Sequence, residues 1–393
     1  MPHIFQKKSD FRKRILVIGM LDSVHFARWL KQFEDQELDF YILASKKYRR
    51  IDPLLVSLSR NSISARYVHF GFQTFSKISG YLDFAIFETL KKISRIDIRQ
   101  IVLSRILKKW NFDFVHALEL QGAGYLLSSV DRQLFSKSKV IVTNWGSDIY
   151  FFRQEFRHKE LIERTLSYAN YYSAECIRDY KLARELGFDG IELPCIPNAG
   201  GFDINAISSQ FSKPSSRNQI LVKGYGNDFG RASMIIELIP ILVQKYPQYN
   251  FHIYSVTDDI AKLIESLPVD VTCKIRVTTV KNKISHSEMM LEFKKSRIYV
   301  GCSVSDGIST SFLESLIYGC YPIQTDTSCA NEWVQRGAMA SIIPLDREVL
   351  LREIEICLDS EELIDSAALV NQNIALKYLS YNVVKEQALK FYS

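Results

Sequence analysis

Two carboxylic acids, Asp306 and Glu314, stand eight positions apart around a short polar loop that contains a glycine. The apolar run over 298–301 before the loop is typical of the end of a buried strand. After the loop, apolar residues recur at helical spacing from about Ser311, and Gly319 ends the expected helix. The first turn of a helix exposes N–H groups and a partial positive charge. The pattern therefore favours an anion-binding site at this helix start.

The stretch over 300–334 resembles the donor-nucleotide site of family 4 glycosyltransferases of the bacterial surface-polysaccharide type, which carries an acid-x7-acid pattern here. The segment GCYPIQTDTSCANEW is similar to the strand and second loop that follow in this family, and the resemblance extends over most of the chain. It implies the GT-B fold, with two Rossmann-like, doubly wound α/β domains facing a central cleft and a C-terminal helix crossing back to the first domain. It also implies a retaining, hexosyl-type glycosyltransferase (EC 2.4 class).

The chain length fits two domains, because 393 residues allow a substantial core in each. We expect an acceptor-binding domain over 1–207 and a nucleotide-sugar-binding domain over 219–378. The polar segment over 208–218, which contains proline and serine, is the expected linker. Residues 379–393 are the expected returning helix.

Lys223 and Arg231 are the expected cations of the donor site. Lys223 stands at the end of an apolar strand pattern over 219–225, and Arg231 stands at the start of the next expected helix. The resemblance places this basic pair on the diphosphate of the donor, where fixed cations stabilise the negative charge that develops as the sugar leaves. It also implies that Asp306 lies near hydroxyls of the donor sugar and that Glu314 holds the ribose. The rest of the expected donor-binding set is Gly307, Ile308, Ser309, Thr310 and Ser311.

Two of these residues have structural alternatives. Lys223 can be a surface lysine at a strand end. Glu314 can close a capping box with Ser311, since the two stand three positions apart at a helix start. No DxD pair stands beside the loop, and the seven cysteines form no CxxC pair. We therefore expect no metal and no cofactor apart from a UDP- or GDP-linked sugar as donor substrate.

The expected acceptor-side residues lie in the first half. His25 belongs to a HFARW stretch on the first expected helix, and His116 stands near the end of the strand expected over 111–118. Trp145 and Asp148 belong to a NWGSD turn that resembles the family's acceptor-side turn, although many relatives have histidine where this chain has Trp145. We expect Asp148 to act as a carboxylate on the acceptor side. The alternative is that it caps the following helix.

Charge is distributed unevenly. The segment over 46–110 contains 14 Lys or Arg and 4 Asp or Glu, a net charge of +10, whereas the whole chain carries +6. Its aromatic and basic pattern is compatible with contact to an anionic membrane, and equally with core helices that have a solvated face. We expect a glycan or lipid-linked acceptor and no nucleic acid, since no nucleic-acid-binding module is evident. The polar start of the chain and the lack of a long apolar run predict a cytoplasmic location, possible also at the inner face of the membrane.

Two rival functions stay open at this point. One is a UDP-sugar 2-epimerase, for which His116 and Asp148 would supply the acid–base groups. The other is a non-catalytic GT-B-like binding subunit. This alternative stays open because Asp306 and Trp145 stand where the family usually has glutamate and histidine. Our expectation is a metal-independent, retaining glycosyltransferase.

Overall fold

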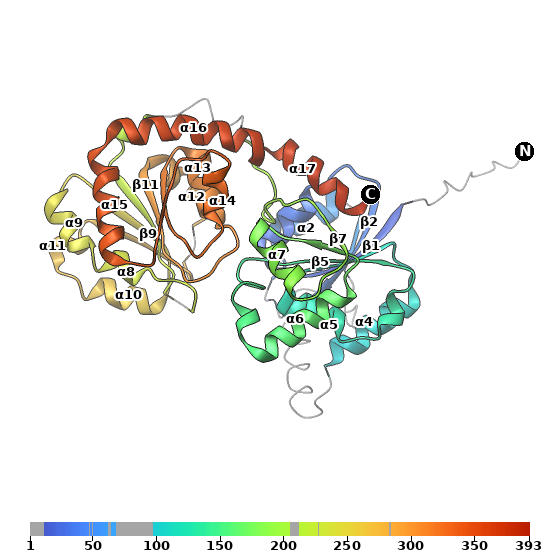
Figure 1. Cartoon of the computed structure of the whole chain (residues 1–393). Helices are drawn as coiled ribbons and strands as arrows, with labels where there is room; N and C mark the ends of the chain where they lie inside the picture. The colour runs from blue at the N-terminus through green and yellow to red at the C-terminus, as the bar shows by residue number, and fades with distance from the viewer. Residues whose placement is uncertain are drawn as a thin grey trace, which may run out of the picture. The chain divides into compact units, whose positions relative to one another are not determined.

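The computed structural model describes residues 12–46, 48, 50–61, 64–67, 97–204, 212–226, 228–282 and 284–393. The chain forms two compact units (Figure 1). Unit 1 comprises Met1–Ala174, Tyr180–Gly200 and Gln387–Ser393, and unit 2 comprises Glu175–Asp179 and Gly201–Glu386. Each unit is described by itself below.

Unit 1 is built on one parallel sheet of seven strands in the order β3-β2-β1-β4-β5-β6-β7. The strands are β1 (Lys13–Gly19), β2 (Leu38–Ala44), β3 (Ser64–Tyr67), β4 (Phe114–Leu118), β5 (Lys139–Thr143), β6 (Tyr171–Ser173) and β7 (Ile191–Glu192). The helices are α1 (Val24–Lys31), α2 (Pro53–Asn61), α4 (Ile98–Lys109), α5 (Tyr125–Ser128), α6 (Phe156–Tyr168) and, from Tyr180 on, α7 (Ile177–Glu185). The apolar runs within β1, β2, β4 and β5 predict this arrangement, because a parallel strand is buried on both faces.

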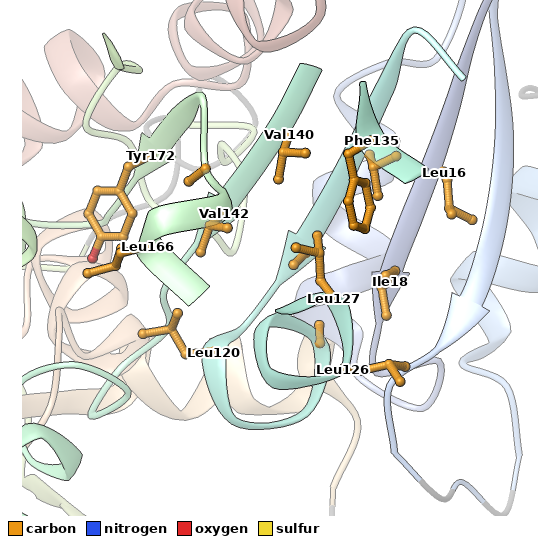
Figure 2. Close-up of a cluster of buried hydrophobic side chains, with 14 of the residues drawn as sticks. Leu16, Ile18, Leu120, Leu126, Leu127, Phe135, Val140, Val142, Leu166 and Tyr172 are labelled. Atoms are coloured by element: carbon orange, nitrogen blue, oxygen red, sulfur yellow. The ribbon is translucent and has the colours of Figure 1, made fainter. Parts of the chain in front are cut away.

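A hydrophobic core covers one face of this sheet. Figure 2 shows Leu16 and Ile18 of β1 and Val140 of β5 on the same side as Leu127 of α5 and Leu166 of α6. These five side chains are fully or almost fully buried. The core therefore fixes the strand ends of β1, β4 and β5, and with them the loops that follow.

Unit 2 repeats the plan with six parallel strands in the order β10-β9-β8-β11-β12-β13. The strands are β8 (Gln219–Lys223), β9 (Asn250–Val256), β10 (Ile275–Thr279), β11 (Ser296–Gly301), β12 (Tyr321–Thr325) and β13 (Ser341–Ile343). The helices are α8 (Ser233–Ile236), α9 (Ile239–Lys245), α10 (Asp258–Glu265), α11 (Val269–Thr272), α12 (His286–Lys295), α13 (Thr310–Tyr318), α14 (Ala330–Gln335), α15 (Arg347–Asp359), α16 (Glu361–Leu379) and α17 (Tyr381–Leu389), whose last residues belong to unit 1.

Both sheets have the strand order of a Rossmann fold. Numbered within its own unit, each sheet runs 3-2-1-4-5-6 through its first six strands, which is the doubly wound order. The prediction of two Rossmann-like domains is thus confirmed. In such sheets ligands bind beyond the carboxyl ends of strands 1 and 4, where the strand order reverses. These strands are β1 and β4 in unit 1, and β8 and β11 in unit 2.

The chain changes unit earlier than the sequence suggests, between Gly200 and Gly201. Backbone hydrogen bonds explain the position: Phe202 N–H donates to Leu379 O at 2.8 Å, and Tyr381 N–H donates to Phe202 O at 2.8 Å. Gly201 permits this approach, since a Cβ there would lie 2.5 Å from the Cα of Tyr381. Residues 205–211, which include the start of the expected linker, lie outside the described residues.

The last residues of the chain are part of the core of unit 1. Phe391 and Tyr392 are buried, and the Phe391 ring packs against Trp29 of α1 with their centroids 4.7 Å apart. Lys13 Nζ donates to the carbonyl of Tyr392 at 2.8 Å. The predicted return of the C-terminus to the first domain is therefore correct.

No helix within the described ranges is both long and apolar enough to span a membrane. Of the basic segment over 46–110, residues 47, 49, 62–63 and 68–96 lie outside the described residues. The predicted membrane contact of this segment stays a prediction.

Candidate active site

Two loops meet in unit 2 at the reversal of strand order. Strands β8 and β11 are parallel neighbours, so the loops that follow them leave the same edge of the sheet. The loop after β8 runs beside the loop after β11: Arg231 N–H donates to Cys302 O at 3.0 Å, and Val304 N–H donates to Phe229 O at 2.8 Å. This pairing brings together the loops that carry the predicted donor-site residues.

Lys223 and Asp306 come close at this point. Lys223 Nζ lies 4.0 Å from Asp306 Oδ2, and each side chain is 24% exposed. Lys223 also lies over the ring of Tyr225, 5.0 Å from its centroid. Burial lowers the pKa of Lys223, but Asp306, neighbouring tyrosines and Glu314 outweigh it, and the net pKa is raised. Lys223 is therefore a fixed cation near neutral pH, and its long ion pair leaves room for an anionic ligand to compete with Asp306.

The start of α13 lies beside this ion pair. Asp306 Oδ1 accepts a hydrogen bond from the N–H of Gly307 at 2.9 Å. Ser309 is the N-cap residue, one position before the first helical residue, Thr310, and its side chain makes no capping bond. Ser311 accepts a hydrogen bond from the hydroxyl of Tyr254 at 2.6 Å. The first-turn N–H groups of α13 thus supply partial positive charge near Lys223.

Of the predicted diphosphate-binding residues, Gly307, Ile308 and Ser309 are buried, while Thr310 and Ser311 are partly exposed. The Ile308 side chain belongs to the hydrophobic core around Phe312. Any contact of Ile308 with a ligand would therefore come from its backbone.

Arg231 lies on the loop before α8 and does not open that helix, which begins at Ser233. Its guanidinium donates to the carbonyls of Gly230 at 2.6 Å and Asp228 at 3.4 Å. These contacts hold the side chain along its own loop, and its role at the diphosphate stays a prediction.

Glu314 pairs with a histidine that sequence reasoning missed. Its carboxylate is 5% exposed and lies 2.9 Å from Nε2 of His286, at the start of α12. The capping-box alternative is wrong, because the N-cap is Ser309 and Glu314 turns to His286. A capping box does form between Ser285 and Glu288, directly around His286. The Ser285–Glu288 pattern in the sequence could have predicted the start of α12. It could not have predicted that His286 contacts Glu314, because this contact depends on how α12 packs against α13.

Arg178 is a second residue that the sequence did not reveal. Its guanidinium donates to the carbonyl of Asp306 at 2.8 Å and to that of Thr327 at 3.4 Å, and to the Asp179 carboxylate at 2.8 Å. Arg178 and Asp306 both belong to unit 2. Arg178 therefore holds the backbone of the loop that carries Asp306.

Four buried side chains on or near the same loop carry polar atoms without a hydrogen-bond partner in the described part of the chain: Ser305 Oγ, Ser309 Oγ, Gln324 Oε1 and Ser328 Oγ. Buried polar atoms normally find a partner, from protein, water or ligand. Their position around the loop over 303–311 is consistent with a site that receives a polar ligand.

In unit 1, Asp148 joins two loops at the ends of β4 and β5. Its Oδ2 accepts hydrogen bonds from Leu120 N–H at 2.8 Å and Trp145 N–H at 2.9 Å. Burial, followed by the nearby charge of Glu119, raises the pKa of Asp148 to about 7. The helix-cap alternative is wrong, since the next two helical segments have Phe151 and Glu155 as N-caps.

Glu119, at the end of β4, was also missed. Its φ is +94°, an uncommon and strained value for a residue with a side chain. The buried carboxylate accepts from Gly122 N–H at 2.7 Å and Ala123 N–H at 2.8 Å, and it lies 3.2 Å from Lys46 Nζ. Gly122 and Gly124 indicate a change of backbone direction in the sequence. The sequence does not show that the Glu119 carboxylate turns back to accept hydrogen bonds from the N–H groups of Gly122 and Ala123.

His25 and Trp145 come together, with their ring centroids 6.3 Å apart and the rings nearly perpendicular. His116 does not share this environment. It is buried, with Nδ1 2.8 Å from the Tyr392 hydroxyl and Nε2 2.7 Å from the Thr143 hydroxyl. Burial lowers the pKa of His116 to about 3, so the ring is neutral. An acceptor contact would require these bonds to break, and the predicted acceptor role of His116 stays a prediction.

Residues 14–177 match the family described as "Glycosyl transferase 4-like". No curated protein sequence matches the chain. Among solved structures, HepE from Anabaena in complex with UDP-glucose has a TM-score of 0.68 at 12% identity, covering 96% of this chain and 98% of that one. The glycosyltransferase from Rickettsia africae ESF-5 has a TM-score of 0.64 at 14% identity, covering 97% and 98%.

Sucrose-phosphate synthase from Thermosynechococcus elongatus has a TM-score of 0.69 at 11% identity, covering 97% of this chain and 98% of that one. Sequence identities of 11–14% show similarity of fold alone, and this similarity extends over both units. Residues 14–177 thus resemble the glycosyl transferase 4-like family, and the two Rossmann-ordered sheets together with the structural likeness identify the fold of the chain as GT-B.

Proposed function

We propose that the protein is a glycosyltransferase that takes a sugar from a nucleotide-diphosphate sugar bound by unit 2. The observation that carries the proposal is the position of Lys223 and Asp306 at the reversal of strand order, beside the start of α13. This arrangement offers one fixed cation, one helix dipole and one carboxylate at the same edge of the sheet. These are the groups that a diphosphate and a sugar hydroxyl require.

Lys223 is proposed to bind the diphosphate and to stabilise its charge as the sugar leaves. The bond between the anomeric carbon and the diphosphate oxygen breaks, and negative charge gathers on that oxygen. A lysine whose pKa is raised keeps its positive charge throughout. The N–H groups at the start of α13 add partial positive charge without a metal, which supports a metal-independent reaction.

Asp306 and Glu314 are proposed to bind hydroxyl groups of the donor. Asp306 is partly exposed and can accept from the sugar. Glu314 is held by His286, so its carboxylate has a fixed direction when it accepts from a ribose diol. HepE was solved with UDP-glucose, and this supports a UDP-linked donor; a GDP-linked donor is the alternative.

The acceptor is proposed to be a glycan or a lipid-linked glycan bound by unit 1. Asp148, His25 and Trp145 are the candidate contacts, and Asp148 can hold or release a proton because its pKa is about 7. The acceptor oxygen forms the new bond to the anomeric carbon, and its proton passes to the leaving phosphate oxygen. Retention of configuration by attack on the front face follows from the family resemblance.

The two rival functions give different products from the same test. Incubation with UDP- and GDP-sugars yields slow release of free sugar and nucleoside diphosphate if the protein is a transferase without its acceptor. An epimerase yields an isomerised UDP-sugar, and a binding subunit yields no turnover. The environment of His116 disfavours the epimerase function. An epimerase would need His116 as one of its two acid–base groups, but both ring nitrogens of His116 are hydrogen-bonded inside the core.

A further inference from the structure

Three side chains that can bind a metal ion, two cysteines and one glutamate, meet in unit 2. The sulfur atoms of Cys176 and Cys329 and a carboxylate oxygen of Glu332 all lie within 4.8 Å of one another. Cys176 comes directly before α7, Cys329 is the N-cap residue of α14, and Glu332 lies in the first turn of α14. The cysteines are 1% and 2% exposed, and Glu332 is partly exposed. Solvent therefore reaches this group on the carboxylate side.

Hydrogen bonds already hold the two segments in place. Glu332 accepts from the N–H groups of Ile177 at 2.8 Å and Arg178 at 3.0 Å. Cys329 N–H donates to the carbonyl of Gly307 at 2.7 Å. A carboxylate has about four lone-pair positions, so Glu332 retains capacity for a further ligand.

The spacing of the three atoms is close to that of a tetrahedral zinc site. With Zn–S bonds of about 2.3 Å and Zn–O bonds of about 2.0 Å, neighbouring ligand atoms lie about 3.5–3.8 Å apart. The observed spread of up to 4.8 Å is closed by side-chain shifts of about 1 Å. Three protein ligands would leave a fourth position for water.

A divalent cation would offset most of the negative charge of this group. Two thiolates and the carboxylates of Glu332 and Asp179 carry four negative charges, and a divalent cation together with Arg178, which pairs with Asp179 at 2.8 Å, supplies three positive charges. A cysteine that binds a metal ion does so as the thiolate, so metal binding releases the thiol proton. The cation would therefore displace two thiol protons to solvent.

We propose that Cys176, Cys329 and Glu332 form a binding site for a soft divalent cation of the zinc class. The sequence argued against zinc because its cysteines form no CxxC pair, and the two that meet here are far apart in the chain. A cation at this site fastens the segment over 175–179 to the start of α14. Both segments contact the loop at 306–307, through Arg178 and Cys329 respectively.

Titration of the full chain with Cd²⁺, without nucleotide, tests this site through the ultraviolet charge-transfer band of cadmium–thiolate bonds. We expect a band that saturates at one equivalent. Cys176→Ser and Cys329→Ser should each weaken Cd²⁺ binding at least about tenfold to a hundredfold, because each removes a ligand. The matched control is Cys273→Ser, which removes an exposed cysteine outside the group and should leave the titration unchanged.

A second measurement needs no variant. Zn²⁺ should slow alkylation of Cys176 and Cys329 by iodoacetamide, read by peptide mass spectrometry, while Cys273 reacts at the same rate. No thiolate band in the wild-type chain, or equal bands in the wild type and in folded Cys176→Ser and Cys329→Ser, would overturn the proposal. Neither readout uses a nucleotide sugar, so its failure leaves the proposed donor site untouched.

Discussion

Replacing Lys223 with alanine removes the fixed cation from the proposed diphosphate position. Two unit charges 4 Å apart interact by about 4 kcal/mol at an effective dielectric constant of about 20, the value typical near a protein surface. The observed Lys223–Asp306 separation of 4.0 Å shows that an anion can reach this distance from Nζ. Loss of one group that stabilises transition-state charge costs about 2.7–4 kcal/mol elsewhere, a factor of about 10²–10³ in kcat. We therefore expect Lys223→Ala to lower turnover at least about a hundredfold.

The same change should leave the fold nearly intact. Both side chains of the pair are 24% exposed, and exposed pairs of this kind contribute about 0–1 kcal/mol to stability. Asp306 also keeps its hydrogen bond to the N–H of Gly307. The free energy of unfolding should thus fall by no more than about 1 kcal/mol, measured by urea denaturation.

The assay is release of nucleoside diphosphate from a nucleotide sugar chosen by a thermal-shift panel. A loss in kcat at little change in KM indicates that the lysine acts in the transition state. Lys262→Ala is the matched control, because Lys262 is an exposed lysine of α10 in the same unit. If Lys223→Ala turns over as fast as Lys262→Ala, Lys223 does not belong to the site.

Three further predictions concern the other parts of the site and the basic segment. Glu314→Gln should raise the Kd for UDP at least about tenfold, or about 1.4 kcal/mol, by calorimetry; a fall in Tm with unchanged Kd would indicate a structural role only. The folded-state pKa of Asp148, about 7, is above its unfolded value near 4, so the stability it contributes when protonated is lost as pH rises from about 4 to 7. Asp148→Asn should therefore gain stability relative to the wild type over this range, by at most about 4 kcal/mol in urea denaturation, and a difference independent of pH would contradict the assignment. Binding to anionic liposomes through residues 46–110 should weaken as salt rises, and no binding at low salt in a flotation assay would refute the membrane contact.

The sequence predicted the elements that position the donor site. Apolar strand patterns before Lys223 and before the loop at Asp306 placed both residues at the carboxyl ends of strands. Parallel pairing of β8 with β11 then brings them to one edge, so these two residues could be expected to meet.

Contacts between helices and between distant segments could not be predicted in the same way. The pairing of Glu314 with His286 depends on how α12 packs against α13, and the capping-box pattern at Ser311 suggested a different partner. Arg178 reaches Asp306 because a five-residue segment belongs to unit 2 although its flanking residues belong to unit 1. No periodicity in the sequence reports such a change of unit.

Buried polar residues posed the same difficulty in unit 1. The sequence identified His116 by residue type and position, but a histidine in a strand looks the same whether its nitrogens face a ligand or the core. Its bond to Thr143 comes from the neighbouring strand β5, whereas its bond to Tyr392 forms only because the C-terminus returns to this unit. Glu119 was overlooked because its role depends on a backbone with positive φ.

A crystal structure of the chain soaked with UDP tests the central claim most directly. The account predicts the diphosphate within hydrogen-bonding distance of Lys223 Nζ and of the N–H groups at the start of α13, with the ribose near Glu314. Nucleotide density elsewhere on the molecule, with the loop over 306–311 empty, would contradict it.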